Sequence, residues 1–170
     1  MDEKRNELIF DDVLKSLDKG RSPIIITERI AHIEKLKCKF QGFVKNLIVL
    51  TGGMTAKQER NELNKLKTIP NDQERLLIAT GKYIGEGFDD SRLDTLFLTL
   101  PISWKGILSQ YVGRLHRLND NKQVVQVYDY VDHREPILQK MYEKRLKGYR
   151  SLGYKLLTET TNENEQLRLF

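Results

Sequence analysis

Residues 110–117, Gln-Tyr-Val-Gly-Arg-Leu-His-Arg, bring together groups that could act on a polyphosphate. On a helix, positions i, i+3, i+4 and i+7 form one stripe, and here they hold Gln110, Gly113, Arg114 and Arg117. Two planar, permanently charged guanidiniums one turn apart suit a phosphate whose charge changes during a reaction. Glycine inside a helix costs about 1 kcal/mol relative to alanine, so Gly113 suggests that a ligand approaches the backbone. The alternative is a solvated arginine face with an incidental glycine.

The opposite side of the same predicted helix is apolar. Leu108, Val112 and Leu115 have the spacing of a stripe that faces a core. We therefore expect this helix to bury one side and to hold both arginines on the other. His116 stands off the arginine stripe, about 100° from Arg117 and about 160° from Arg114, and we expect it to pack rather than to catalyse.

Composition sets the class of protein. The 170 residues are 39% hydrophobic and 31% charged, and the net charge is +5, as in a globular domain compatible with a nucleic-acid partner. Neither a signal peptide nor an apolar run of about 18 residues occurs, so we expect no membrane span. Cys38 is the only cysteine, which fits a cytoplasmic location. The histidines and Cys38 lack metal-ligand spacing, so we predict no structural metal.

Short apolar runs alternate with amphipathic segments along the chain. The pattern predicts strands near 24–27, 47–50, 76–80, 94–100 and 124–128, and helices near 2–18, 29–39, 55–67, 105–117 and 136–152. This alternation predicts an α/β fold, with a mostly parallel sheet between two layers of helices. We expect one domain over residues 1–157, with its core at 21–152, followed by a polar, loosely held tail at 158–170.

Polar and glycine-rich segments follow three of these strands, where ligands of parallel sheets bind. They are Thr27-Glu28-Arg29, Thr51-Gly52-Gly53 and Thr80-Gly81-Lys82. Their small side chains and exposed amides suit phosphate, although glycines after strands can also simply make turns. The chain contains no Gly-x-x-x-x-Gly-Lys-Ser/Thr loop, and no strand ends in paired acids suited to magnesium. We expect Asp129 and Asp132 to cap the helix that follows them.

Four segments, in order over residues 23–130, together resemble the second, C-terminal RecA-like lobe of superfamily 2 helicases. The resemblance is nearest to bacterial DEAD/DEAH-type and type III restriction-like motors. Pro23–Arg29 resembles motif IV, and Leu50–Met54 with Arg60 resembles the segment after it. Ala79–Asp89 resembles motif V, and Gln110-x-x-Gly-Arg-x-x-Arg117 resembles motif VI. The resemblance implies a RecA-like three-layer sandwich.

The resemblance also implies roles at a shared ATP site. Arg114 and Arg117 would be arginine fingers for the γ-phosphate, and Gln110 and Gly113 would line the same cleft. Asp89, with Gly87, would contact the ribose or link the state of ATP to motif VI. Tyr111 departs from the pattern, because many relatives carry a further arginine there.

The resemblance assigns a second group of residues to the sugar-phosphate backbone of a nucleic acid; it favours DNA, although the sequence leaves the choice between DNA and RNA open. These residues are Thr27, Arg29, Thr51, Gly52, Gly53, Thr80, Gly81 and Lys82. Hydroxyls and backbone amides suit this task, because phosphate contacts position a strand without reading its bases.

The implied enzyme is an ATP-dependent helicase or translocase. ATP and Mg²⁺ would be held mainly by an N-terminal lobe of the same parent protein, so we expect the chain alone to be inactive. The alternative is a degenerate helicase-like domain that binds nucleic acid or protein without catalysis. A self-contained Rossmann-like enzyme would need a Gly-x-Gly-x-x-Gly after its first strand, and Pro23–Arg29 contains no glycine.

Some residues have simpler interpretations. We expect Trp104 to be a partly buried anchor rather than a base-stacking residue, and Tyr142, Tyr149 and Tyr154 to pack. Lys140, Lys144 and Lys147 form a basic face at helical spacing. Such a face is usually only solvated, but in a nucleic-acid motor it could also follow the backbone.

Overall fold

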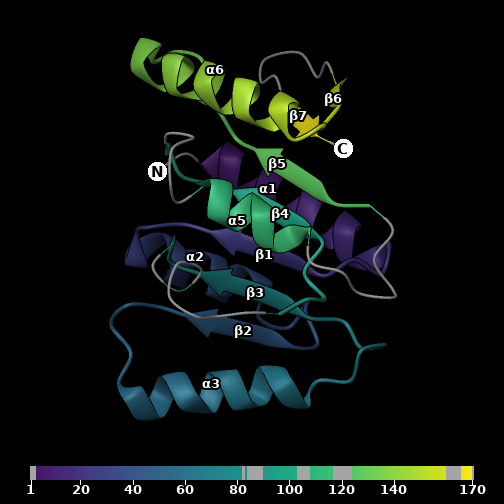
Figure 1. The fold of residues 1–170 in the computed structure, drawn as a ribbon. Coiled ribbons are helices and arrows are strands. Elements are labelled where there is room, and N and C mark those ends of the chain that lie inside the picture. Colours follow the sequence, from purple (N-terminus) through teal and green to yellow (C-terminus); the bar gives the residue numbers. More distant parts are fainter. Residues whose placement is uncertain are drawn as a thin grey trace.

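A computed structural model describes residues 3–81, 83, 90–102, 108–116, 124–159 and 166–169. Five neighbouring parallel strands, followed by an antiparallel pair, form a seven-stranded sheet (Figure 1). In spatial order they are β2 (Leu47–Leu50), β3 (Leu76–Ala79), β1 (Pro23–Ile26), β4 (Thr95–Leu98) and β5 (Gln126–Asp129). The predicted α/β fold with a mostly parallel sheet is therefore confirmed.

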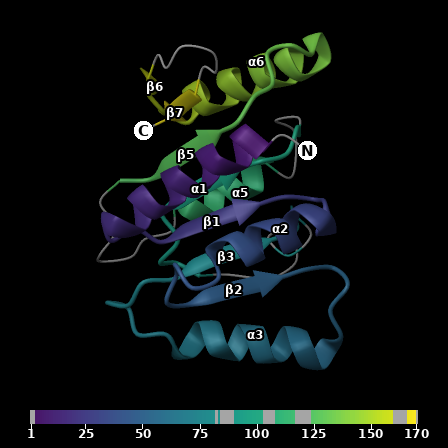
Figure 2. The same cartoon turned by 180° about the vertical axis from the view of Figure 1, so that it is seen from behind.

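Helices cover both faces of the sheet, as the figures show from the two sides. On one face lie α1 (Glu3–Asp18) and α2 (Ile30–Phe40), seen in front of the strands in Figure 2. On the other lie α3 (Ala56–Thr68) and α5 (Ser109–Leu115), joined by the end of α6 (Pro136–Ser151). No helix in the described part of the chain is long and apolar enough to cross a lipid bilayer.

Alternation within the strands builds the two cores. In β1, Ile24 and Ile26 face the core under α3 and α5, whereas Ile25 faces the core under α1 and α2. All three side chains are buried. Successive side chains of a strand point to opposite faces, so an unbroken apolar run fits a strand covered on both sides.

The end of the chain contains two strands that the sequence analysis did not predict. β6 (Leu156–Glu159) and β7 (Gln166–Leu169) pair antiparallel with each other, and β7 pairs antiparallel with β5. The sequence Leu167-Arg168-Leu169 alternates apolar and polar residues, which is the pattern of a strand, but it is short and follows a polar segment. The hairpin extends the sheet beyond β5.

A buried ion pair attaches α6 to the sheet. Arg145 donates from Nε and Nη2 to the two oxygens of Asp129 at 2.7 and 2.9 Å, and from Nη1 to the carbonyl of Ile102 at 2.6 Å. The Tyr149 hydroxyl donates to the same carboxylate at 3.0 Å. The prediction that Asp129 caps α6 is therefore wrong. Its carboxylate is 0% exposed, and a charge buried this deeply requires a cation as partner.

Asp132 does not cap α6 either. Its side chain accepts from the backbone N–H of Arg134, and the helix begins after Glu135, which makes no side-chain capping bond. Pro136 at the first helical position needs no N–H partner, so the helix can begin without such a cap.

Candidate functional site

The carboxyl ends of the parallel strands align a row of threonines. Leu50, Ala79, Ile26 and Leu98 end four neighbouring strands in register. The next residue is threonine in every case: Thr51, Thr80, Thr27 and Thr99. Hydrogen bonds continue the ladder by one step, from Thr80 N to Leu50 O at 3.0 Å and from Thr27 N to Ala79 O at 3.1 Å. The structure therefore brings the three predicted loops together at one edge of the sheet and adds Thr99, which the sequence analysis missed.

The hydroxyls of this row face different surroundings. Thr27 is 2% exposed and its hydroxyl lies 3.0 Å from Nδ1 of His32. The Thr99 hydroxyl donates to the Ile26 carbonyl at 2.8 Å. The buried Thr80 hydroxyl has no partner among the described residues, and Thr51 is partly exposed. In this conformation Thr51 is the member of the row most open to a strand in solvent.

His32 fixes the segment that follows β1. Its Nε2 lies 3.1 Å from Oδ1 of Asn6 on α1. Burial and the nearby charges of Arg5, Arg29 and Lys35 lower the pKa of His32 to about 4, so the imidazole is neutral at pH 7. A neutral ring that donates from Nε2 to Asn6 accepts at Nδ1 from the Thr27 hydroxyl. This chain of hydrogen bonds ties α1 and α2 to the end of β1.

Arg29 and two glycines form the exposed part of the edge. Arg29 is exposed at the start of α2, and no ion pair of the described residues involves it. Gly52 and Gly53 are exposed, and a Cβ at either would meet no atom within 4 Å. Their φ angles are also outside the left-handed region. Neither packing nor backbone conformation requires glycine here, which leaves an open approach to the backbone as the feature these residues provide.

The N-terminus of α3 follows these glycines, but one of its amides is already occupied. Thr55 accepts from the N–H of Gln58, and the Gln58 side chain accepts from the Thr55 N–H. This capping box satisfies two of the N–H groups at the start of the helix, those of Thr55 and Gln58. An anion would therefore meet the backbone of Gly52 and Gly53 rather than a fully open helix terminus.

The two predicted faces of α5 are confirmed for the residues described. Leu108, Val112 and Leu115 are at most 2% exposed, whereas Gln110 and Gly113 are exposed. A Cβ at Gly113 would meet no atom within 4 Å. The helix therefore offers a polar, uncrowded stripe to solvent. The side chain of Arg114 and the whole of Arg117, Lys82, Gly87, Asp89 and Trp104 lie outside the described residues, so the roles predicted for them stay predictions.

Tyr111 lies on the buried side of α5 and meets the end of β3. It is 2% exposed and its hydroxyl has no partner among the described residues. Burial, and to a lesser extent the charge of Glu28, raise the pKa of Tyr111. The Gly81 N–H donates to Glu28 Oε1 at 3.1 Å. A Cβ at Gly81 would lie 2.1 Å from the Tyr111 hydroxyl oxygen and 2.3 Å from Glu28 Oε1, so the end of β3 packs closely against α5 at Gly81.

We expect Gly81→Ala to lower the free energy of unfolding by about 1–3 kcal/mol, the usual cost of overpacking. Tyr111→Phe alone should be nearly neutral, because it removes a buried hydroxyl that has no partner. Combined with Gly81→Ala it should recover part of the loss, because the closest contact disappears. Urea denaturation of the three variants measures this. Gly113→Ala is the matched control and should stabilise the helix by up to about 1 kcal/mol; equal losses at positions 81 and 113 would contradict the packing argument.

Comparison with known proteins finds similar sequences from viruses. No protein-family model matches it. It is 30% identical over 158 residues to the putative helicase 161L of invertebrate iridescent virus 6, covering 89% of this chain and 34% of the relative. It is 29% identical over 121 residues to the transcript termination protein OPG145 of monkeypox virus, covering 69% of this chain and 24% of the relative. The chain thus spans about a third or less of the length of these two relatives.

A shorter viral protein is covered more fully. The uncharacterized protein 108L of invertebrate iridescent virus 3 is 36% identical over 83 residues, which is 49% of this chain and 75% of that protein. The chain belongs to the family of protein 108L. The name of that protein states no activity. These relatives are viral, and the bacterial subgroup suggested by the motifs stays a prediction.

Solved structures show the fold. T4 UvsW matches with a TM-score of 0.65 and 18% identity, over 87% of this chain and 32% of that one. The C-terminal part of the Fun30 ATPase domain matches with a TM-score of 0.61 and 16% identity, over 82% and 44%. Domain 2 of the Mss116p DEAD-box helicase matches with a TM-score of 0.52 and 17% identity, over 73% and 47%. The chain has the RecA-like fold of helicase lobes.

Proposed function

We propose that the chain is the second motor lobe of an ATP-dependent nucleic-acid helicase or translocase of superfamily 2. It would act with a first lobe that carries the phosphate loop and the magnesium ligands. The observation that carries the proposal is the sharing of one sheet edge by three strand-end loops and the motif VI helix. The contact between Gly81 and Tyr111 fixes that proximity. The name of the relative 161L, a putative helicase, supports the same function.

The described residues of α5 are compatible with a nucleotide held by another lobe. Gln110 and Gly113 leave the stripe open, and Leu108, Val112 and Leu115 fix the helix by burial. By its spacing, Arg114 belongs to the stripe of Gln110 and Gly113. ATP, with Mg²⁺, would supply the phosphoryl group and the free energy. This chain would place the positive charges of Arg114 and Arg117 beside the γ-phosphate, and Asp89 and Gly87 would lie near the ribose.

Nucleic acid would lie along the sheet edge without base recognition. Arg29 offers an exposed guanidinium and Gly52 and Gly53 offer exposed backbone, while Thr51, Thr80, Thr27, Gly81 and Lys82 complete the predicted contacts. Contacts of this kind bind phosphate in any sequence. We propose DNA as the preferred strand, and a cytoplasmic site of action.

We expect weak, sequence-indifferent binding to single-stranded DNA with a marked dependence on salt. About four phosphate contacts give a slope of log affinity against log salt near −3, at about −0.7 per contact. Arg29→Ala should make the slope shallower by about one contact. Fluorescence anisotropy of a labelled oligonucleotide at several salt concentrations measures this, with an RNA strand of the same length beside it.

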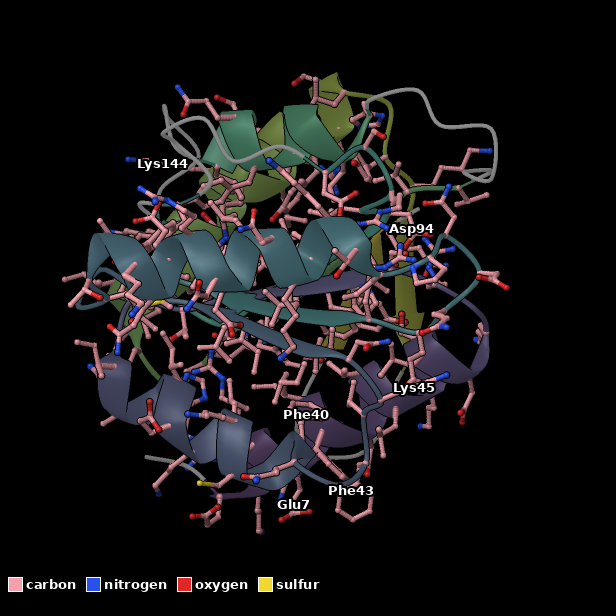
Figure 3. All side chains as sticks on the ribbon, turned by 90° about the horizontal axis from the view of Figure 1, so that it is seen from below. Glu7, Phe40, Phe43, Lys45, Asp94 and Lys144 are labelled. Carbon is pink, nitrogen blue, oxygen red and sulfur yellow. The ribbon has the colours of Figure 1, made fainter. Side chains whose placement is uncertain are left out.

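Lys45→Ala is the matched control. Lys45 is exposed and lies shortly before β2, at the amino ends of the strands, whereas the proposed contacts lie at their carboxyl ends (Figure 3). It removes the same charge without touching the proposed contacts. A salt-independent interaction, strong base preference, or equal effects of Arg29→Ala and Lys45→Ala would overturn the proposed interface.

A further inference from the structure

One side of α6 carries a stripe of lysines. Lys140, Lys144 and Lys147 are all exposed. At 100° per residue they lie within an arc of about 60°, and they extend over about 10 Å of the helix. Three cations at intervals of about 5 Å approach the linear charge density of a nucleic-acid strand, which carries one phosphate per about 3.4 Å of helix axis. Glu143 is also exposed on this side of the helix.

These lysines differ from those of α2, which pair with acidic side chains, in having no acidic partner within the described part of the chain. Lys35 pairs with Glu3 of α1 at 3.3 Å, Lys39 pairs with Glu7 of α1, and Lys37 pairs with Glu34. Among the described residues, no ion pair or hydrogen bond involves the side chains of Lys140, Lys144 and Lys147. No carboxylate of the described residues neutralises their charge, which can therefore attract an external anion.

The helix that bears the stripe is held rigidly. The bidentate bond from Arg145 to Asp129 and the hydrogen bond from Tyr149 fix its buried side against β5. Tyr142, on the same buried side, is 5% exposed. A fixed helix presents its cations in one direction, so a strand that binds them loses less conformational freedom than it would with cations on a mobile segment.

The stripe also lies on the appropriate side of the molecule. Figure 3 shows Lys144 on the side opposite Asp94 and Lys45, which lie just before β4 and β2 at the amino ends of the strands. Lys144 therefore lies toward the carboxyl ends, where the loops of the proposed interface are. In the sheet, β5 lies two strands from β1, about 10 Å at the usual strand spacing.

We propose that Lys140, Lys144 and Lys147 bind the phosphate backbone of the same nucleic-acid strand, extending the interface from the loops after β2, β3 and β1 to α6. This rests on the proposed function, since it assumes a strand at that edge. The proposal predicts that the contribution of α6 to binding depends on the length of the nucleic-acid strand. The loops span about 10 Å, which a strand of about 5 nucleotides covers, whereas simultaneous contact with the loops and α6 needs a longer strand, and about 15 nucleotides is ample for it.

The test compares the wild-type chain with the triple variant Lys140→Ala, Lys144→Ala and Lys147→Ala. Salt-dependent anisotropy is measured with oligothymidylates of about 5 and about 15 nucleotides. For the longer strand the slope should become shallower by about 2, at about 0.7 per lost contact. For the shorter strand it should not change. The control is Lys19→Ala, Lys45→Ala and Lys67→Ala, which removes the same charge from exposed positions near the amino ends of the strands.

The outcomes separate this proposal from the proposed function. An unchanged slope for the longer strand, or equal changes in the two triple variants, would overturn the α6 interface while strand binding by the wild type still supported the motor lobe. If the wild type bound neither strand in a salt-dependent way, the proposed function would fail first. Melting temperatures close to the wild-type value in both variants exclude unfolding as the cause of any change.

Discussion

Replacing Arg114 or Arg117 by alanine should lower nucleic-acid-stimulated ATP hydrolysis by about 10³–10⁵-fold in a protein that carries both motor lobes. Arginine fingers contribute about this much to phosphoryl transfer, which equals about 4–7 kcal/mol of transition-state stabilisation. Arg→Lys should restore little, because an ammonium cannot reproduce the planar fork of donors. Steady-state phosphate release with and without DNA gives the rates, and the chain alone should show no turnover.

The buried side of the same helix supplies the control. Leu115 is 2% exposed, so Leu115→Ala should lower the free energy of unfolding by about 2–5 kcal/mol. The arginine variants should melt near the wild-type temperature and bind DNA normally. Arginine variants that unfold early would place these side chains in the core. Arginine variants with normal ATPase rates would favour the degenerate, non-catalytic domain.

Much of the fold could be predicted from the sequence because β1, β2 and β3 are short apolar runs, each followed by polar residues. The predicted bounds of Leu47–Leu50 agree with the structure, β1 is shifted by one residue from the prediction, and β3 ends one residue earlier than predicted. Burial on both faces makes such runs continuous rather than alternating. The same periodicity predicted which side of α5 is buried, because a helix of this spacing has only one apolar stripe.

Interactions between distant segments could not be predicted in this way. Asp129 follows a strand and precedes a helix, so local rules favoured a cap, whereas its partner stands 16 positions later at Arg145. Tyr111 was treated as a departure from a motif, yet the structure places it in the core against Gly81. The fourth threonine, Thr99, became visible only when the register aligned the strand ends. Such pairs depend on three-dimensional proximity, which periodicity in one segment does not encode.

Arg145→Ala should lower the free energy of unfolding by about 3–5 kcal/mol, because it leaves a buried carboxylate without its cation. The Asp129 side chain is 0% exposed, and that of Arg145 is 2% exposed. Burial alone would lower the pKa of Arg145, but the hydrogen bonds and charge of Asp129 outweigh it and raise the pKa. The guanidinium therefore stays charged in the folded state. Urea denaturation at pH 7 measures the loss.

Arg150→Ala is the control for this prediction, since Arg150 is exposed on the same helix, and its replacement should change stability by no more than about 0.5 kcal/mol. Combining Asp129→Asn with Arg145→Met should cost less than the sum of the two single changes, because the double variant leaves no unpaired charge. Additive losses would show that the two residues stabilise the fold independently. In that case the rigid attachment of α6, on which the direction of its lysine stripe depends, would need another source.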